Sequence, residues 1–124
     1  MGYYLPDQDH GPEHSVFVDF FATRKATLPG LGKIAKLSRS KVLPMFASMN
    51  TEDGTFDIEI LPAFELDKGD EQDARTCNQA IEYFVGSKPE QYMWVLQLLR
   101  SQEDGNNYYN IFKPRYDTDW QVKK

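Results

Sequence analysis

The stretch that decides the fold is DEQDARTCNQAIEYFVG, residues 70–86 of a 124-residue chain. Its apolar side chains recur every three or four positions, a spacing that places them on one face of an α-helix. That face consists of Ala74, Cys77, Ile81 and Phe84. Asp70 is of a type that caps helix N-termini, and Gly86 is of a type that follows helix ends. The sequence therefore predicts a helix from Asp70 to about Val85 that packs on a core through this face.

A β-hairpin is predicted before that helix. Residues 42–49 and 55–61 are two β-like runs, and the turn-forming sequence NTEDG joins them. The second run alternates between apolar and acidic side chains, as a strand with two different faces does. We expect Phe56, Ile58 and Ile60 to face inward, and Asp57 and Glu59 to face outward.

Two further β-like runs and a helix are predicted in the N-terminal part. Residues 3–5 have the character of the end of a buried strand, stopped by Pro6, and residues 16–21 form a second run. Because no turn or cap precedes the first run, we expect the chain to start within a fold. A basic amphipathic helix is expected to begin near Pro29, with apolar side chains at helical spacing and cations on its other faces. The apolar residues are Leu28, Leu31, Ile34 and Ala35, and the cations are Lys33, Lys36 and Arg39.

The sequence SKPE at residues 87–90 has the form of a capping box and predicts a last helix from Glu90 to Arg100. This helix would be apolar almost all round, so that it packs deeply or faces lipid or another segment. Residues 105–124 form a poorly patterned tail rich in asparagine and tyrosine. We therefore expect one domain portion over residues 1–104 and a tail over residues 105–124.

Composition and charge limit the class of protein. A hydrophobic share of 40% suffices for a core, and no apolar run is long enough to span a bilayer. A single cysteine, Cys77, excludes an internal disulfide. The net charge of −5 is uneven: residues 20–51 hold six cations and no acid, and residues 52–104 hold thirteen acids and four cations. The basic stretch suits an anionic partner, either ligand phosphates or a membrane surface, and it equally suits a solvated helix face.

His14 and Asp19 have the spacing of the catalytic histidine–acid pair of many acyltransferases. In an extended strand, however, residues five apart point to opposite faces and lie roughly 16 Å apart. A base and the carboxylate that orients it must approach to about 2.6–3.2 Å. We therefore interpret this pair as coincidental. The sequence shows no glycine-rich phosphate loop, nucleophile elbow or paired-cysteine motif, and His10 with Asp7 and Asp9 is not a convincing metal cluster.

Three strings of the sequence resemble the late acyltransferases of lipid A biosynthesis. They are YYLPDQDHGPEHSVFVDFFATRKATLPGLGKIAKL, VLPMF and PEQYMWVLQLLR, which begin at residues 3, 42 and 89. More narrowly, they resemble the branch that adds the second secondary acyl chain, usually myristate. The PDQD and FVDFFAT blocks are the most specific, and the resemblance covers residues 2–104. Arg24 departs from it, because the family pattern leads us to expect an aromatic residue there.

The resemblance implies an α/β fold, namely the C-terminal part of a mixed sheet with flanking helices, like that of the glycerol-phosphate acyltransferases. It implies an enzyme with one N-terminal anchor and an active site at the cytoplasmic face of the bacterial inner membrane. Such enzymes move an acyl chain from acyl carrier protein, a thioester co-substrate, to a hydroxyl of the Kdo-bearing, already acylated lipid A precursor. No other cofactor, no metal and no nucleic acid is implied.

The resemblance also implies where the catalytic residues of such an enzyme lie. The family's catalytic pair and its anchor come well before the PDQD block, so we expect both upstream of Met1. This chain is then expected to lack a catalytic residue of its own and to be inactive in isolation. The sequence leaves open whether Met1 is the authentic start of the protein.

Two groups of substrate-binding candidates follow from the same resemblance. The first group follows a predicted strand end, where it would orient the catalytic histidine or bind sugar hydroxyls; local turn capping is the alternative. The second group precedes the predicted basic helix, where it would hold a substrate phosphate; a solvated face is the alternative. The first group is Asp7, Gln8 and Asp9, and the second is Arg24, Lys25 and Thr27.

Two classes of function therefore stay open. The chain is part of a lipid A acyltransferase, or it is a catalytically silent truncated module that binds anionic lipid or a partner. Acyl transfer from a loaded carrier protein separates the two.

Overall fold

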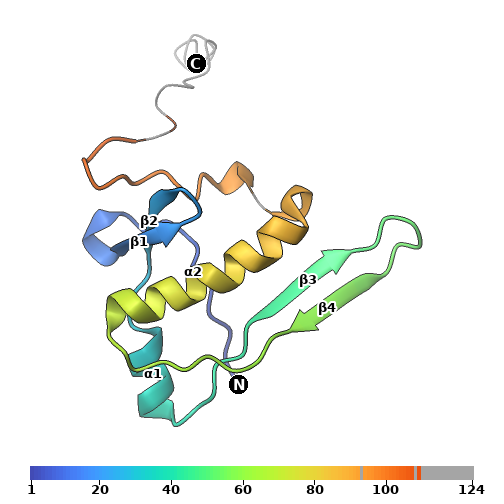
Figure 1. The fold of residues 1–124 in the computed structure, drawn as a ribbon, viewed down its shortest axis with the longest axis horizontal. Helices are drawn as coiled ribbons and strands as arrows, with labels where there is room; N and C mark the ends of the chain where they lie inside the picture. The colour runs from blue at the N-terminus through green and yellow to red at the C-terminus, as the bar shows by residue number, and fades with distance from the viewer. Residues whose placement is uncertain (93, 108, 110–124) are drawn as a thin grey trace, which may run out of the picture.

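The computed structural model describes residues 1–92, 94–107 and 109. This part of the chain folds into two α-helices and two antiparallel hairpins, which confirms the α/β class. Figure 1 shows their arrangement. The elements are β1 (Val16–Phe20), β2 (Thr23–Thr27), α1 (Leu31–Ser38), β3 (Met45–Met49), β4 (Phe56–Ile60) and α2 (Asp70–Ser87), with 3-10 turns η1 (Pro12–His14), η2 (Pro89–Gln91) and η3 (Trp94–Leu96). Among the described residues, no helix combines the length and the apolar character needed to cross a membrane.

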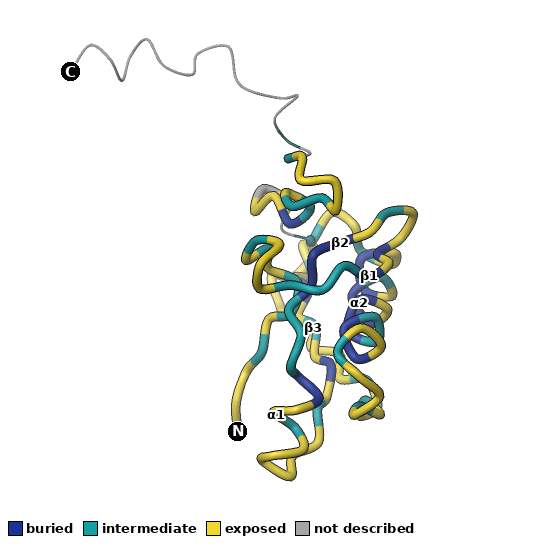
Figure 2. Tube along the Cα trace, turned by 90° about the vertical axis from the view of Figure 1, so that its left-hand side faces the viewer, coloured by how far each residue is buried: buried dark blue, intermediate teal, exposed yellow. Residues whose placement is uncertain are grey.

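Helix α2 forms the centre of the packing, as the sequence predicts. The expected apolar face is buried at Ala74, Cys77, Ile81 and Phe84. Phe20 of β1 packs against this face and joins Ile81, Phe84 and Val85 in one buried cluster. Figure 2 shows that the buried positions gather on α2 and on the adjacent strands β1 and β2. The core is therefore one helix face covered by the first hairpin.

The N-terminus of α2 is capped differently from the prediction. Gly69, and not Asp70, occupies the N-cap position, and no side chain caps it. Instead, the buried carboxylate of Asp73 accepts the main-chain N–H groups of Asp67 and Lys68, each at 3.1 Å. The Asp73 carboxylate, in the first turn of α2, thus binds the main chain that precedes the helix. The helix dipole also favours a negative charge at this end.

Helix α1 confirms the predicted basic helix. Lys33 donates to Asp70 at 3.1 Å, and Lys36 donates to Asp67 at 2.8 Å. Both acids belong to the start of α2 or to the segment just before it. Two cations of the basic stretch therefore form ion pairs within the chain. This agrees with the alternative that the basic stretch is a solvated helix face.

The first hairpin is only partly predicted. Strand β1 is confirmed, whereas its partner β2 is not recognisable in the sequence TRKAT, which lacks an apolar alternation. The two strands are antiparallel, with Val16 opposite Thr27. The strand expected over residues 3–5 is absent and that prediction is wrong. This segment is irregular, and its Tyr4 hydroxyl donates to the Pro29 carbonyl at 3.2 Å.

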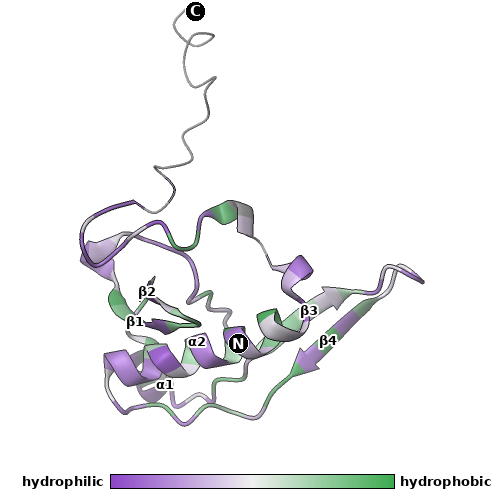
Figure 3. Cartoon of the chain, turned by 45° about the horizontal axis from the view of Figure 1, so that its top comes forward, coloured by the Kyte–Doolittle hydropathy of each residue, from purple (hydrophilic) through white to green (hydrophobic). Residues whose placement is uncertain are grey.

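The second hairpin is confirmed, but its predicted inward face is wrong. β3 pairs antiparallel with β4, and the hairpin extends away from the rest of the molecule (Figure 1). One face packs on α2, where Phe46 stacks on Phe84 with ring centroids 4.8 Å apart and Tyr83 donates to Glu59 at 2.7 Å. The residues expected to be buried are exposed: Phe56, Ile58 and Ile60. The alternation itself is right, as the hydrophobic and hydrophilic bands of β4 in Figure 3 show.

The last predicted helix is also wrong. Residues 90–100 hold the short turns η2 and η3, with Tyr92 extended between them and Gln97 at φ 52°. The Gln91 side chain accepts from the Met49 N–H and donates to the Met49 carbonyl, both at 2.8 Å. This bond to the edge of β3 turns the chain away from a helical path. Outside the described residues lie Met93, the side chain of Val95, residue 108 and residues 110–124, which make up most of the predicted tail.

Candidate functional site

The turn at Asp7, Gln8 and Asp9 is bound by distant parts of the chain. The main-chain carbonyl of Asp7 accepts a hydrogen bond from Lys25 Nζ at 2.6 Å. The Asp7 carboxylate accepts one from the Tyr92 hydroxyl at 2.9 Å. These donors lie 18 and 85 residues along the chain, so tertiary folding positions the turn.

Lys25 is a cation with 0% of its surface exposed. The alternation of side chains along β2 turns Lys25 inward and Arg24 outward. The Lys25 ammonium also donates to the Ala26 carbonyl at 3.1 Å. Burial lowers the pKa of Lys25 to about 8, and the charges of Asp7 and Asp9 act against this shift. Because a buried charge is tolerated only with hydrogen-bond partners, these two carbonyls explain how β2 accommodates a lysine.

Asp9 is held by Ser101 and Gly11. The main-chain N–H and the hydroxyl of Ser101 donate to its carboxylate at 2.5 and 2.8 Å, and the Gly11 N–H donates at 2.9 Å. Burial acts to raise the pKa of Asp9, but these hydrogen bonds outweigh it and lower the pKa below its ordinary value. Gln8 is exposed. The turn therefore presents Gln8 to solvent, while both carboxylates bind the chain itself.

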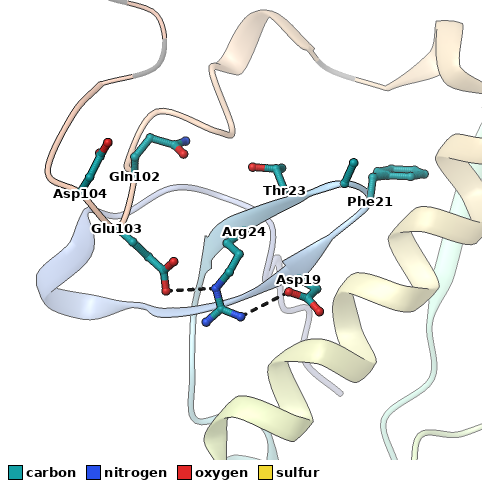
Figure 4. Close-up of a pocket in the computed structure, with 8 residues that line it drawn as sticks. Asp19, Phe21, Thr23, Arg24, Gln102, Glu103 and Asp104 are labelled. Atoms are coloured by element: carbon teal, nitrogen blue, oxygen red, sulfur yellow. Dashed lines mark hydrogen bonds and ion pairs between the residues drawn. The ribbon is translucent and has the colours of Figure 1, made fainter.

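Arg24 lies in a separate cleft on the outer side of β2 (Figure 4). Its guanidinium donates to Glu103 at 3.0 Å, to Asp19 at 3.3 Å and to the Phe17 carbonyl at 2.7 Å. The cleft has a volume of about 580 Å³, and Asp104 is a third carboxylate in its lining. With three acids around one guanidinium, this cleft repels a phosphate as it is folded here.

Thr27 is buried inside the fold. The Asn78 amide of α2 donates to the Thr27 hydroxyl at 3.0 Å and to the Asp19 carbonyl at 3.2 Å, which ties the first hairpin to α2. Arg24, Lys25 and Thr27 therefore do not converge on one anion site before α1. The structure does bring Lys25 together with the Asp7–Asp9 turn. The substrate-binding role of all six candidates stays a prediction.

Sequence reasoning missed three residues that support the turn and the first hairpin. They are Asn78, Tyr92 and Ser101, and their contacts span 51, 85 and 92 residues. No local spacing reveals contacts of that range. Tyr92 lies within the family-like string that begins at residue 89, which is the one signal that marks it.

His14 and Asp19 are not hydrogen-bonded to each other. His14 ends η1 and is exposed, β1 runs extended between the two residues, and Asp19 pairs with Arg24 at 3.3 Å. The extended backbone expected between them is thus present. Across residues 1–92, 94–107 and 109, no three side chains of metal-ligating type are grouped to hold an ion.

Met1 lies at the exposed start of the irregular N-terminal segment. The family resemblance places the catalytic pair upstream of Met1, and the described residues do not test that placement. It therefore stays a prediction, as does the expected inactivity of the isolated chain. The contacts of the Asp7–Asp9 turn come instead from residues that follow it in the sequence.

Comparison with known proteins identifies the family to which this chain belongs. The family model described as bacterial lipid A biosynthesis acyltransferase matches residues 1–101. A lipid A biosynthesis acyltransferase of Haemophilus influenzae is 58% identical over 110 residues, which cover 89% of this chain and 35% of the relative. The lipid A biosynthesis myristoyltransferase of Escherichia coli is 49% identical over 106 residues (84% of this chain, 33% of the relative), and the lauroyltransferase of the same organism is 31% identical over 107 residues (83% and 35%).

The chain therefore belongs to the bacterial lipid A biosynthesis acyltransferase family. It spans about a third of the length of these curated relatives.

Proposed function

We propose that the protein that carries this chain is an acyltransferase of lipid A biosynthesis. It moves a fatty acyl group from acyl carrier protein to a hydroxyl of the Kdo-bearing, already acylated lipid A precursor, at the cytoplasmic face of the inner membrane. Membership of the family supports the reaction class. Myristoyl is the proposed acyl group, because identity is 49% to a relative named as a myristoyltransferase and 31% to one named as a lauroyltransferase.

The chemistry is a thioester-to-ester exchange. A general base removes the proton from the acceptor hydroxyl, and the resulting oxygen nucleophile attacks the thioester carbonyl. The new C–O bond forms, the C–S bond breaks, and the carrier thiol leaves with a proton, while hydrogen-bond donors hold the oxyanion. In this proposal the base belongs to a part of the family's polypeptide outside this chain. The two hairpins contribute to a mixed sheet of the glycerol-phosphate-acyltransferase type.

The observation that carries a role for this chain is the fixation of the Asp7–Asp9 turn. Lys25 and Tyr92 hold Asp7, and Ser101 holds Asp9. A site built on a turn that is held from several directions loses little freedom when substrate binds. We assign Asp7 and Asp9 to positioning the turn, and the exposed amide of Gln8 to the substrate's sugar hydroxyls.

Mass spectrometry of lipid A tests this proposal. The gene for the protein that carries this chain is expressed in bacteria from which the resident late acyltransferase gene has been deleted. We expect lipid A to regain one acyl chain. Gln8→Ala should reduce the amount of lipid A that carries the regained acyl chain. Gln79→Ala, which changes an exposed glutamine of α2, should not. Lipid A that stays unchanged with the wild-type gene would contradict the acyltransferase, and equal effects of the two variants would remove Gln8 from the site.

A second candidate is a catalytically silent module that binds an anionic lipid surface. Arg39 and Lys41 form no salt bridge within the described residues, and the neighbouring Leu37 is 86% exposed. Cations beside an exposed apolar side chain suit an anionic membrane surface. Sedimentation with phosphatidylglycerol vesicles tests it: binding that is lost in Arg39→Gln/Lys41→Gln, together with unchanged lipid A in the cells above, would favour the module over the enzyme.

A further inference from the structure

One face of the second hairpin is apolar along its whole length. The antiparallel register places three pairs on this face: Met45 opposite Ile60, Ala47 opposite Ile58, and Met49 opposite Phe56. The five large side chains among them are between 46% and 70% exposed. These six residues are called the apolar hairpin face below. A continuous apolar patch of this kind on a protein surface commonly marks an interaction site.

The opposite face of the hairpin is already occupied by α2 and the segment that follows it. Phe46 stacks on Phe84, and the Lys88 ammonium donates to the buried Ser48 hydroxyl at 2.9 Å. Because strand side chains alternate between two faces, these contacts oblige the apolar hairpin face to point away from the described core. Figure 1 shows that the loop between β3 and β4 projects from the rest of the molecule, while Gln91 of η2 contacts the main chain of Met49 at the end of β3.

The charge of this segment discriminates between kinds of partner. Residues 42–67 contain six acids and no lysine or arginine. An anionic lipid surface attracts basic segments and repels acidic ones, so it is disfavoured here. An uncharged, apolar sheet face instead fits a second apolar layer of protein, which is how sheets complete a core. A two-stranded hairpin also has free edges and is marginal alone, so it gains from such a layer.

The relatives contain protein that can supply this layer. The Haemophilus influenzae relative is 58% identical to this chain, yet the match covers 35% of its length. It therefore carries polypeptide that has no counterpart in this sequence. We infer that the apolar hairpin face is the docking surface for that part of the family's polypeptide, which packs on β3 and β4 as a second apolar layer.

Reconstitution from two chains tests this inference. This chain is co-expressed with a tagged polypeptide that comprises the part of the Haemophilus influenzae relative it does not match. We expect the two to co-purify in equal amounts. Amide hydrogen exchange over residues 45–60 should slow at least 10-fold in the complex relative to this chain alone. Phe56→Ser/Ile58→Ser should remove both effects, and because these side chains are exposed, circular dichroism of the variant chain should match that of the wild type.

Leu37→Ser is the matched control, because Leu37 is 86% exposed but lies on α1. It should leave co-purification unchanged. Failure of the wild-type pair to co-purify, or equal effects of the hairpin variant and the control, would overturn the inference. So would protection of residues 45–60 in this chain alone at high concentration, which would assign the face to a second copy. Protection of the same residues by phosphatidylglycerol vesicles would assign the face to lipid and would likewise overturn it.

Discussion

Lys25 donates to the main-chain carbonyl of Asp7 at 2.6 Å, from a side chain that is entirely buried. This contact connects the middle of β2 to the N-terminal turn, 18 residues earlier. A lysine that is part of the family-like string at residues 3–37 thus binds the main chain of the N-terminal turn in this structure. The stability of the turn therefore depends on this cation.

Lys25→Met should destabilise the fold. The substitution keeps most of the side-chain volume but leaves the carbonyls of Asp7 and Ala26 without their donor. An unsatisfied buried acceptor costs about 1–3 kcal/mol, and we expect a loss in that range in urea denaturation. Lys33→Met, which removes an exposed ion pair with Asp70, should cost below about 1 kcal/mol. Equal losses of unfolding free energy in the two variants would show that the buried Lys25 contact stabilises the fold no more than an exposed ion pair does.

The free energy of unfolding should depend on pH through Lys25. Its pKa falls from the ordinary value of 10.5 to about 8 on folding. Between these values the unfolded chain binds more protons, so this contribution rises with pH, by at most about 1.4 kcal/mol per pH unit.

The raised pKa values of Cys77 and Tyr92 act in the opposite direction at alkaline pH. The informative quantity is therefore the difference between wild type and Lys25→Met, measured from pH 7.5 to 10. A difference that does not change with pH would refute the assignment.

Tyr92 and Asp7 should be energetically coupled. Burial raises the pKa of the Tyr92 phenol, as does the Asp7 carboxylate, so the hydroxyl stays protonated and donates at 2.9 Å. A double-mutant cycle with Tyr92→Phe and Asp7→Asn should give a coupling energy of about 1–2 kcal/mol. Tyr83 provides the control, because it also donates to a carboxylate, that of Glu59, but is exposed. The same cycle there should give no measurable coupling, because solvent screens an exposed pair.

Ser101→Ala should make the protein more sensitive to acid. The hydrogen bonds of Ser101 and Gly11 outweigh burial and lower the pKa of Asp9, so its stabilising contribution is present above pH 3.8 and is lost as the pH falls through the folded-state value. Without the Ser101 hydroxyl, that value rises and the acid-unfolding midpoint should move to higher pH. Ser40→Ala removes only a local contact to the Ser38 carbonyl and should leave the midpoint unchanged. A carbon-13 titration of the Asp9 carboxyl measures the shift directly.

Cys77 should resist alkylation in the folded protein. Burial raises the pKa of its thiol to about 11, from an ordinary 9. At pH 8 the reactive thiolate is then about 100-fold less populated than in an ordinary cysteine, and access is restricted as well. Iodoacetamide labelling, followed by intact mass, should be slow in buffer and fast in urea. Fast labelling under native conditions would mean that the apolar face of α2 is open.

The sequence by itself determines the elements whose pattern is local. Helix α2 and its buried face, helix α1, strand β1 and the existence of the second hairpin all follow from short periodic runs. The ends of α2 do not follow, because Gly69 and not Asp70 is its N-cap and the helix continues through Gly86 to Ser87. The predictions of these elements are correct because each pattern extends over only one or two turns of a helix, or over one strand.

Only the tertiary structure decides the rest. Strand β2 is hidden in the sequence because two of its three buried residues, Lys25 and Thr27, are polar, and they become buried only when Asp7 and Asn78 supply partners. The second hairpin has the predicted alternation, yet which face turns inward is set by the Phe46 stack on α2 and not by the strand's own composition. Burial of a polar group, or exposure of an apolar one, depends on neighbours that lie tens of residues away. A local pattern carries no information about such neighbours, and the turn at Asp7–Asp9 becomes a defined structure only when the chain has folded around it.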